Sequence, residues 1–375
     1  MFKISEKEYP PQGVYQSTRE WINTLCLEKS DAGELYTEYH PGDIFHSPEP
    51  KSLEKVMHWK FRRDNHHESP AAFVAIVPGG RVWGDNGVVI TPDNKLLADI
   101  SNEYNKTTKE HPIFREENLP PVDYSLETVA VLASIWSFNY YHWMFDILPR
   151  IALLRSSNIA VDKFIINLSG ALFQQDTLSV LGIPEAKIIK SYNQFHLEAA
   201  QLVVPSLPGD LGYMPRWACE FIRKEFLIDR NIEMVEGYER IYISRVNATS
   251  RQVINEPQVR NVLAKYGFKS VMLDSMSLAD QAMLFSSARI IVSPHGAGFA
   301  NLVFCSPGTK VIEFFSPNYV NVLYWHLSNK MNLDYYYFIG EGNRSPEYVD
   351  PHYIWENISV NIKTLIKTME LAGIQ

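Results

Sequence analysis

The sequence predicts an α/β protein that consists of two doubly wound domains. The first observation is the length of 375 residues, which is more than a single hydrophobic core usually supports. The second and third are two stretches, residues 124–206 and 239–315, in which short apolar segments alternate with segments of helical pattern. Because strands that alternate with helices along a chain form parallel sheets, each stretch predicts one such sheet.

The N-terminal region precedes the first predicted parallel sheet. Residues 1–68 are polar and contain several prolines, so we expect them to be irregular. Residues 71–101 contain short apolar runs that are interrupted by turn residues at 78–80, 85–87 and 92–94. This pattern predicts a small antiparallel decoration on the first domain.

The first alternating stretch completes the N-terminal domain. The elements expected there are a strand at 126–134, a helix at 142–156, a strand at 163–167, a helix at 171–182 that stops at Gly182, and strands at 187–190 and 199–206. A Pro/Gly cluster and an amphipathic helix follow at 208–227. We therefore expect one domain at 1–213 and a second at 214–375.

The second stretch predicts a doubly wound domain. Its expected elements are strands at 239–245, 269–274, 289–294 and 310–315, and helices at 255–267, 277–288 and 296–304. Ligands of such sheets bind outside the carboxyl ends of the strands, which are expected at Arg245, Asp274, Pro294 and Phe315. A final helix at 357–373 could pack back across the first domain.

The composition excludes several classes of protein. A formal net charge of −8 argues against a nucleic-acid-binding face, since phosphate backbones are held by clustered Lys and Arg. The three cysteines, Cys26, Cys219 and Cys305, have no metal-ligand or redox spacing. The N-terminus has no signal-sequence core, and no stretch approaches the roughly 18–20 apolar residues of a membrane span. These features predict a cytoplasmic protein.

A glycine-rich turn after the strand at 289–294 is the clearest candidate site. The strand ends in Pro294-His295, and a Gly-Ala-Gly turn opens the next helix. Backbone N–H groups there, with no Cβ at Gly296 and Gly298 to block approach, could hold a diphosphate. His295 could give a proton or a hydrogen bond to a leaving phosphate. The alternative is a tight strand-to-helix turn with a structural histidine.

Two arginines could supply the local positive charge that an acidic chain needs to hold an anion. Arg245 ends a strand, and Arg251 follows six residues later, before Asn255 and Glu256. A guanidinium group binds phosphate oxygens through its planar fork. The alternatives are that Arg251 is solvated and pairs with Glu256, and that Asn255 is only a helix N-cap.

Two further residues lie near the same predicted edge. Glu313 is on the strand at 310–315, where a carboxylate could accept hydrogen bonds from ribose hydroxyls. Ser277 opens a helix and could cap it or contact a nucleobase, and capping is the simpler role.

His142, Asp146 and Arg150 are spaced i, i+4 and i+8, so they share one face of a predicted helix. A His and carboxylate pair could deprotonate an acceptor hydroxyl. The alternative is a buried helix in which His142 bonds Asp146 and Asp146 pairs with Arg150.

Several motifs are absent from the sequence. It contains no Asp-x-Asp pair, no GxxxxGK[ST] loop, no GxSxG elbow, no Cys/His metal cluster and no GxGxxG after the first strand. We therefore expect no metal and no cofactor, and a metal-independent transferase rather than a kinase, a hydrolase, or a nucleotide-sugar epimerase or dehydrogenase.

These segments together resemble the family 61 glycosyltransferases, which include bacterial capsular polysaccharide biosynthesis proteins. The resemblance spans about residues 125–330. It is carried, in family order, by YYHWMFDILPRI at 140–151, YISR with a following Arg and NE at 242–256, MSLADQ at 276–281, and PHGAGFANLVFCSPGTKVIEF at 294–314.

The resemblance implies a GT-B architecture, with two Rossmann-like doubly wound domains facing a cleft, and an inverting, metal-independent transfer from a UDP-sugar. The implied acceptor is a cytoplasmic glycan or lipid-linked glycan for capsular or surface polysaccharide, handled by a peripheral protein at the inner face of the membrane. The matched positions imply donor contacts at Arg245, Arg251, Asn255, Ser277, His295, Gly296, Gly298 and Glu313, with His142, Asp146 and Arg150 facing the transfer site. The main alternative is a nucleotide-sugar-binding protein that has lost catalysis and acts as an assembly partner in polysaccharide synthesis.

Overall fold

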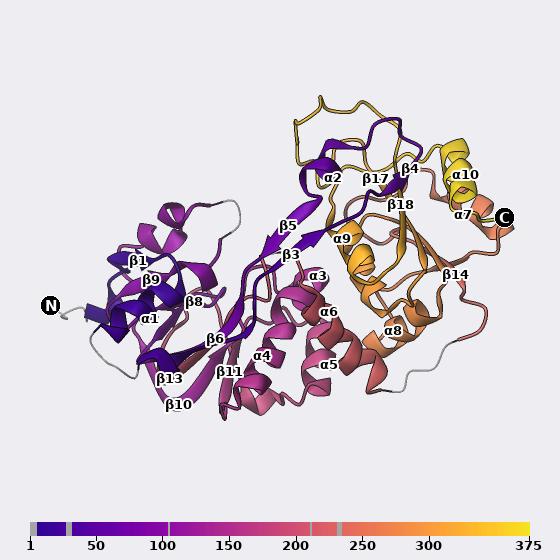
Figure 1. Cartoon of the computed structure of the whole chain (residues 1–375). Coiled ribbons are helices and arrows are strands. Elements are labelled where there is room, and N and C mark those ends of the chain that lie inside the picture. The colour runs from indigo at the N-terminus through magenta and orange to yellow at the C-terminus, as the bar shows by residue number, and fades with distance from the viewer. Residues whose placement is uncertain (1–5, 28–31, 104–105, 211, 231–234) are drawn as a thin grey trace. The chain divides into compact units, whose positions relative to one another are not determined.

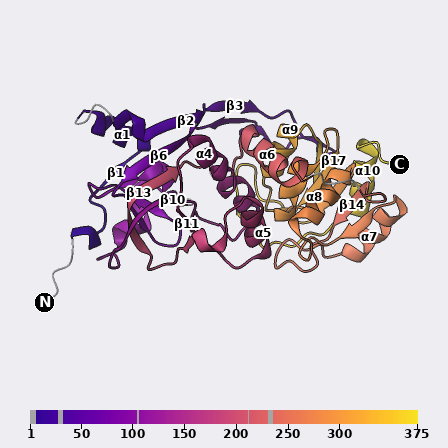
Figure 2. The same cartoon turned by 90° about the horizontal axis from the view of Figure 1, so that it is seen from below.

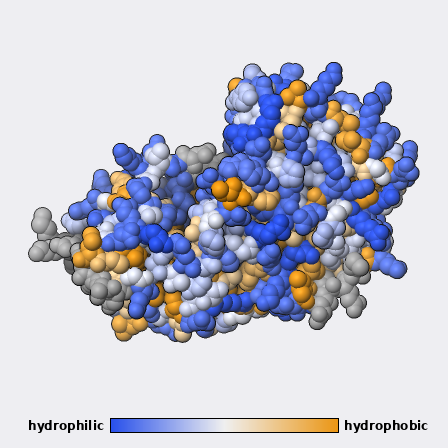
Figure 3. All heavy atoms as spheres, viewed as in Figure 1, coloured by the Kyte–Doolittle hydropathy of each residue, from blue (hydrophilic) through white to orange (hydrophobic). Residues whose placement is uncertain are grey.

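The computed structural model describes residues 6–27, 32–103, 106–210, 212–230 and 235–375 as a mixed α/β protein (Figure 1). The chain divides into two compact units. The first contains residues 1–43 and 70–214, and the second contains residues 44–69 and 215–375. Hydrophilic residues cover most of the face seen in Figure 3, and hydrophobic residues are scattered among them, as is usual for a folded chain.

The first unit is organised around one long central strand, β13 (His196–Pro205). On one side β13 pairs in parallel with β10 (Asp123–Val131), and on the other it pairs antiparallel with β6 (Ala72–Pro78) and β7 (Arg81–Trp83). The sheet order is β1-β9-β8-β7-β13-β10-β11-β12, and β6 also pairs with β2. The remaining strands are β1 (Gly13–Tyr15), β2 (Tyr36–His40), β8 (Val88–Ile90), β9 (Lys95–Leu97), β11 (Lys163–Ile166) and β12 (Ile188–Lys190).

The predicted elements of the first α/β stretch are present, and the strands of the segment at 71–101 pair antiparallel as expected, but they are part of the main sheet and not a decoration on it. They continue the main sheet, because β13 is long enough to pair with β6 and β7 along its free edge. Helix α4 (Pro149–Ser157) packs across β6, β13 and β2 (Figure 2). Helix α5 (Leu172–Val180) ends before Gly182, which has a left-handed φ of 78°.

The N-terminal residues that were expected to be irregular contain regular structure. Helix α1 (Thr18–Cys26) follows β1 and is capped by Ser17, which accepts a hydrogen bond from the N–H of Glu20. The Glu20 carboxylate accepts in turn from the N–H of Gln16. This reciprocal pair is a variant of the capping box, and the Ser-x-x-Glu spacing at 17–20 is the sequence signal for it.

The second unit contains a parallel sheet in the order β15-β14-β16-β17-β18-β4. The strands are β14 (Arg240–Ile243), β15 (Lys269–Val271), β16 (Ile290–Pro294), β17 (Lys310–Phe315), β18 (Asp334–Ile339) and β4 (Lys51–Ser52). The chain runs from β14 to β15 and then crosses to β16 on the other side of β14. The carboxyl ends of β14 and β16 therefore meet at the point where the strand order reverses, which is where open α/β sheets bind ligands.

Helices cover both faces of this sheet, as a buried parallel sheet requires. On one face, α7 (Glu256–Lys265) and α10 (Ile362–Leu371) contact each other and share a core with the sheet residues Tyr242, Ile312 and Phe338 (Figure 1). The final helix, which could have crossed back to the first domain, thus packs in the second unit. The other group contains α6 (Arg216–Arg223), the π-helix η8 (Lys224–Ile228), α8 (Leu278–Ser287), the 3-10 helix η9 (Ala297–Phe304) and α9 (Leu323–Lys330), connected by mutual contacts.

The segment 44–69, which we call the excursion, belongs by its contacts to the second unit, although it lies within the N-terminal domain expected at 1–213. It contains β4, helix α2 (Trp59–Arg63) and the antiparallel pair β3 (Asp43–His46) and β5 (His66–Ser69). Phe61 on α2 is 0% exposed, and its ring packs among the rings of Phe315, Trp325 and Tyr337. Burial of this one large aromatic side chain stabilises the excursion by roughly 2–3 kcal/mol.

Candidate functional site

The carboxyl edge of the second sheet brings Arg245 next to the glycine-rich turn. Arg245 follows β14, and its Nη2 atom donates to the carbonyl of Ser250 at 2.9 Å. Its guanidinium lies over Gly296, where an added Cβ would be 2.0 Å from Nη1. Gly296 has an extended backbone with a φ of 176°, so a glycine is needed there for space and not for its conformation.

The two glycines were expected to leave the backbone open to a diphosphate, but side chains of the protein fill the space beside them. The open face of Gly296 is occupied by Arg245, and a Cβ at Gly298 would meet Cδ1 of Leu273 at 2.8 Å. Both glycines therefore accommodate side chains of the protein itself. The helix that was expected after this turn is present as a 3-10 helix.

Arg251 lies beside Arg245 and is also bound to backbone carbonyls. Its Nε atom donates to the carbonyl of His295 at 3.1 Å, and its Nη1 atom donates to that of Ile354 at 2.6 Å. Its backbone has a left-handed φ of 54°, which costs a non-glycine residue roughly 1–2 kcal/mol. The guanidinium also lies over the ring of Tyr319, 5.3 Å from the centroid. The expected alternative, an ion pair between Arg251 and Glu256, does not form, since Glu256 accepts from the hydroxyls of Tyr242 and Ser244.

The two guanidiniums form a cluster of positive charge, which we call the arginine cluster. Burial, followed by repulsion from Arg251, lowers the pKa of Arg245 to about 10. The buried Nε atom of Arg245 has no hydrogen-bond partner among the described residues. An anion bound here would supply the missing acceptor and reduce the repulsion.

His295, the residue between β16 and the turn, forms a hydrogen bond with the buried side chain of Glu313. The Nδ1 atom of His295 lies 2.6 Å from Oε1 of Glu313, and the hydroxyl of Tyr335 donates to Oε2 at 2.6 Å. The expectation that Glu313 accepts ribose hydroxyls at the sheet edge is therefore not supported, because the side chain is 0% exposed and both oxygens are engaged. Glu313 instead positions His295.

Burial sets the protonation of this pair. It lowers the pKa of His295 well below its usual value, and Arg251, Arg245 and Lys60 lower it further. Burial raises the pKa of Glu313 well above its usual value. When both groups are neutral, the Glu313 hydroxyl donates to Nδ1 of His295, and the remaining imidazole proton is on Nε2. His295 is then a neutral hydrogen-bond donor beside the arginine cluster.

Asn255 and Ser277 have structural partners. The Asn255 side chain accepts from the N–H of Val360 and donates to its carbonyl, both at 2.9 Å, and so fixes the segment that leads into α10. It makes no capping bond to α7. Ser277 caps α8 by accepting from the N–H of Asp280 at 3.1 Å, which is the simpler of its two expected roles.

In the first unit, His142 and Asp146 form a hydrogen-bonded pair. Nδ1 of His142 lies 2.6 Å from Oδ2 of Asp146, and the His142 side chain is 13% exposed. The helix is not a continuous α-helix: α3 (Tyr140–His142) is followed by the π-helix η6 (Trp143–Ile147) before α4. Such single-turn π segments occur often at functional sites. Trp136, with a left-handed φ of 62°, places its ring 4.7 Å from the His142 ring.

Arg150, which was expected to face the transfer site, is buried in the first unit and bound to backbone carbonyls. The side chain is 2% exposed and donates to the backbone carbonyls of Val131, Leu132 and Pro205. These carbonyls are at the carboxyl ends of β10 and β13, so Arg150 holds the two strand ends together. Its burial lowers its pKa to about 10.

Three residues near the arginine cluster were missed. Tyr319 follows β17, and its place after a strand end was a readable signal. Tyr335 is on β18 beside Val311, but nothing in its local sequence indicates a bond to Glu313. Lys60 comes from the excursion at 44–69, and no local pattern could link it to residues some 260 positions later.

Among the described residues, no group of three His, Cys, Asp or Glu side chains is arranged to hold a metal ion. None of the helices that these residues form is long and apolar enough to cross a membrane.

Residues 140–312 match the model of the family described as Glycosyltransferase 61. This range includes the His142–Asp146 pair, the arginine cluster and the glycine-rich turn. A comparison of the chain with curated proteins finds no match.

Proposed function

We propose that this chain, which belongs to glycosyltransferase family 61, transfers a sugar from a nucleotide-sugar donor to a glycan acceptor. Family membership supports glycosyltransferase activity in general.

The arginine cluster is the observation that carries the proposal. Arg245 and Arg251 stand beside each other at the carboxyl edge of β14, and within the described part of the chain their hydrogen bonds go to the backbone carbonyls of Ser250, His295 and Ile354. Two guanidiniums that form no ion pair with a carboxylate among the described residues suit the diphosphate of a nucleotide-sugar. The neutral His295 could donate its Nε2 proton to the same anion.

The proposed reaction is a displacement at the anomeric carbon of the donor sugar. The acceptor oxygen forms a bond to this carbon while the bond to the diphosphate oxygen breaks. The arginine cluster and the His295 donor stabilise the negative charge on the departing diphosphate. The His142–Asp146 pair takes the proton of the acceptor hydroxyl, and either residue could be the base.

Several finer features remain predictions. They are a UDP-sugar as the donor, inversion at the anomeric carbon, independence of metal and other cofactors, a GT-B arrangement of two Rossmann-like domains, and a product that is capsular or surface polysaccharide. A glycan or lipid-linked glycan acceptor and a cytoplasmic location belong with these predictions.

The first test is a thermal-shift measurement with UDP, GDP, CMP and NAD in the presence of EDTA. A ligand that binds only the folded state raises the melting temperature, so we expect UDP to raise it without metal. A response to NAD alone, or to none of the four, contradicts the nucleotide-sugar proposal. UDP binding without release of UDP from any UDP-sugar would favour the inactive assembly partner instead.

The second test compares two arginines, one at the start of β14 and one just after its end. Arg245→Ala removes half of the arginine cluster and is expected to abolish transfer while the protein stays folded. Arg240→Ala is the matched control, because Arg240 begins β14 and donates to the carbonyl of Tyr266 at 2.7 Å. Equal activity in the two variants contradicts the assignment of Arg245 to the donor.

A further inference from the structure

The second unit contains a pocket that the proposed function has not used. Its cavity volume is about 300 Å³, and its wall comes from three separate segments, 54–60, 317–320 and 344–351, with Ile339 of β18. All three segments lie outside residues 140–312, the range that matches the family model. The pocket is thus built from parts of the chain that the family match does not include.

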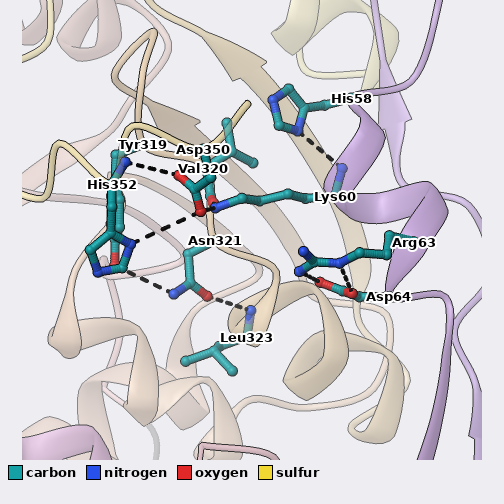
Figure 4. A network of polar contacts seen from close by, with 10 residues as sticks. All are labelled: His58, Lys60, Arg63, Asp64, Tyr319, Val320, Asn321, Leu323, Asp350 and His352. Atoms are coloured by element: carbon teal, nitrogen blue, oxygen red, sulfur yellow. Dashed lines mark hydrogen bonds and ion pairs between the residues drawn. The ribbon is translucent and has the colours of Figure 1, made fainter. Parts of the chain in front are cut away.

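The charged side chains of this wall are already paired. Lys60 forms an ion pair with Asp350 at 2.5 Å and donates to the carbonyl of Val320 at 2.8 Å (Figure 4). Arg344 binds Glu54 through both terminal nitrogens, at 2.8 and 2.9 Å. The pocket therefore lacks the unneutralised cations of the arginine cluster and is better suited to an uncharged group than to a phosphate.

The rest of the wall contains apolar side chains together with the polar Asn318, Ser345 and His58. Val56, Pro317 and Val349 are among its apolar side chains. His58 also lines it, and its Nδ1 atom accepts from the N–H of Lys60 at 3.3 Å. A neutral imidazole that accepts at Nδ1 carries its proton on Nε2, so His58 can donate a hydrogen bond to a carbonyl-bearing ring.

Tyr319 connects the pocket to the arginine cluster. Its neighbours Asn318 and Val320 are in the pocket wall. Its own ring contacts Arg251, 5.3 Å from the centroid, and the ring of His295 at 5.5 Å. A ligand with an uncharged ring system in the pocket could thus place an attached anion at the arginine cluster.

We infer that this pocket binds the nucleoside of the nucleotide-sugar donor, with its diphosphate at the arginine cluster. The inference rests on the proposed function. A nucleoside has the required chemistry, since it is an uncharged heterocycle with hydrogen-bonding edges joined to a hydroxylated ring. It also assigns the excursion at 44–69 to recognition of the donor, because this segment supplies His58 and Lys60.

The test measures the two halves of the ligand separately by calorimetry on the full chain. The probes are uridine for the pocket, inorganic pyrophosphate for the arginine cluster, and UDP for both. Val349→Trp narrows the pocket from a side chain that is 50% exposed, so it can be accommodated without disturbing the core. Leu371→Trp is the matched control, on α10 of the same unit and 46% exposed.

We expect Val349→Trp to weaken uridine and UDP binding at least tenfold and to leave pyrophosphate binding unchanged. Arg245→Ala should weaken pyrophosphate binding and leave uridine binding unchanged. Leu371→Trp should change the binding of neither probe. Val56→Trp fills the pocket from the opposite segment and repeats the test if Val349→Trp unfolds. If another nucleoside binds more strongly than uridine and Val349→Trp abolishes its binding, the pocket assignment is supported and only the identity of the base differs from uracil.

Two outcomes overturn the inference in distinguishable ways. In the first, Val349→Trp and Val56→Trp release UDP from a UDP-sugar with the KM of the wild type. The proposed function then stands, and the nucleoside does not bind in this pocket. In the second, the wild-type protein fails to bind or hydrolyse any nucleotide-sugar, which contradicts both the inference and the proposed function.

Discussion

The Nδ1 atom of His295 lies 2.6 Å from Oε1 of Glu313, with Tyr335 donating to the other carboxyl oxygen at 2.6 Å. All three side chains are buried. The geometry and the opposite pKa shifts of the two titratable groups indicate a neutral pair in which Glu313 donates to His295.

A neutral Glu313 can be replaced by an amide. In Glu313→Gln, the amide N–H can donate to Nδ1 of His295 while the amide oxygen accepts from Tyr335, so we expect transfer within about tenfold of wild type. Glu313→Leu removes the hydrogen-bond donor to Nδ1, so the imidazole proton of His295 is no longer fixed on Nε2. This change should reduce kcat on the order of 100-fold. The measurement is kcat and KM across pH 5–9 for both variants. If Glu313→Gln is as impaired as Glu313→Leu, the pair is ionised.

The contact between Gly296 and Arg245 predicts an effect of a single methyl group. In Gly296→Ala the new Cβ would overlap the Arg245 guanidinium, so the guanidinium must move and lose its place at the arginine cluster. Since a charge-assisted hydrogen bond contributes about 1.5–3 kcal/mol, UDP affinity should fall about 10- to 100-fold.

Gly298→Ala is the control for this prediction. Its Cβ meets only Cδ1 of Leu273, the far end of a flexible side chain, so donor affinity should change little. Similar losses in the two variants would mean that the turn itself, and not the arginine, governs binding.

Arg150→Met tests the structural role that replaces the predicted catalytic one. The change leaves the carbonyls of Val131, Leu132 and Pro205 without their donor in a buried site. We expect the free energy of unfolding, measured with urea, to fall by at least about 3 kcal/mol. Activity per folded molecule should stay near that of wild type, and a specific loss of kcat without loss of stability would restore a catalytic role.

A second arginine of α4 provides the comparison. Arg155 donates to the carbonyl of Leu181 at 3.0 Å and is less buried than Arg150. Arg155→Met should therefore cost only about 1 kcal/mol.

His58 predicts a dependence of stability on pH. Burial, followed by the nearby charges of Lys60 and Arg344, lowers its pKa from 6.5 to about 4, and Asp350 opposes this in part. Between these values the unfolded chain binds a proton that the native state does not, so the free energy of unfolding falls as pH decreases from 6.5 towards 4. Loss of this histidine should reduce that fall.

The variant His58→Asn keeps a side chain that can cap α2 and removes the titration. Its melting temperature should fall less than that of wild type between pH 7 and pH 5, by a difference on the order of 2 °C. Identical pH profiles would show that His58 does not titrate differently in the folded and unfolded states.

Only part of the candidate site could be predicted from the sequence. Arg245, Arg251, His295 and Gly296 lie within 52 positions of one another and follow strands whose apolar pattern was plain, so their meeting at one sheet edge was predictable. The role of Glu313 was not, because alternation on a strand says that a carboxyl group is buried but does not identify its partners. The contacts of Arg150 were not predictable for the same reason: helical spacing gave its face, and only the ends of β10 and β13 showed what that face contacts.

The sequence by itself determined the α/β class, strands β14 to β17 of the second sheet with the helices between them, and the position of the arginine cluster. These features depend on local apolar periodicity and on short-range order along the chain. Tertiary structure alone decided the merging of residues 71–101 into the first sheet, the delivery of Lys60 and His58 to the second unit, and the bond between Glu313 and His295. Each of these depends on which distant segments are close enough to exclude water and pair, and a local pattern of side chains contains no such information.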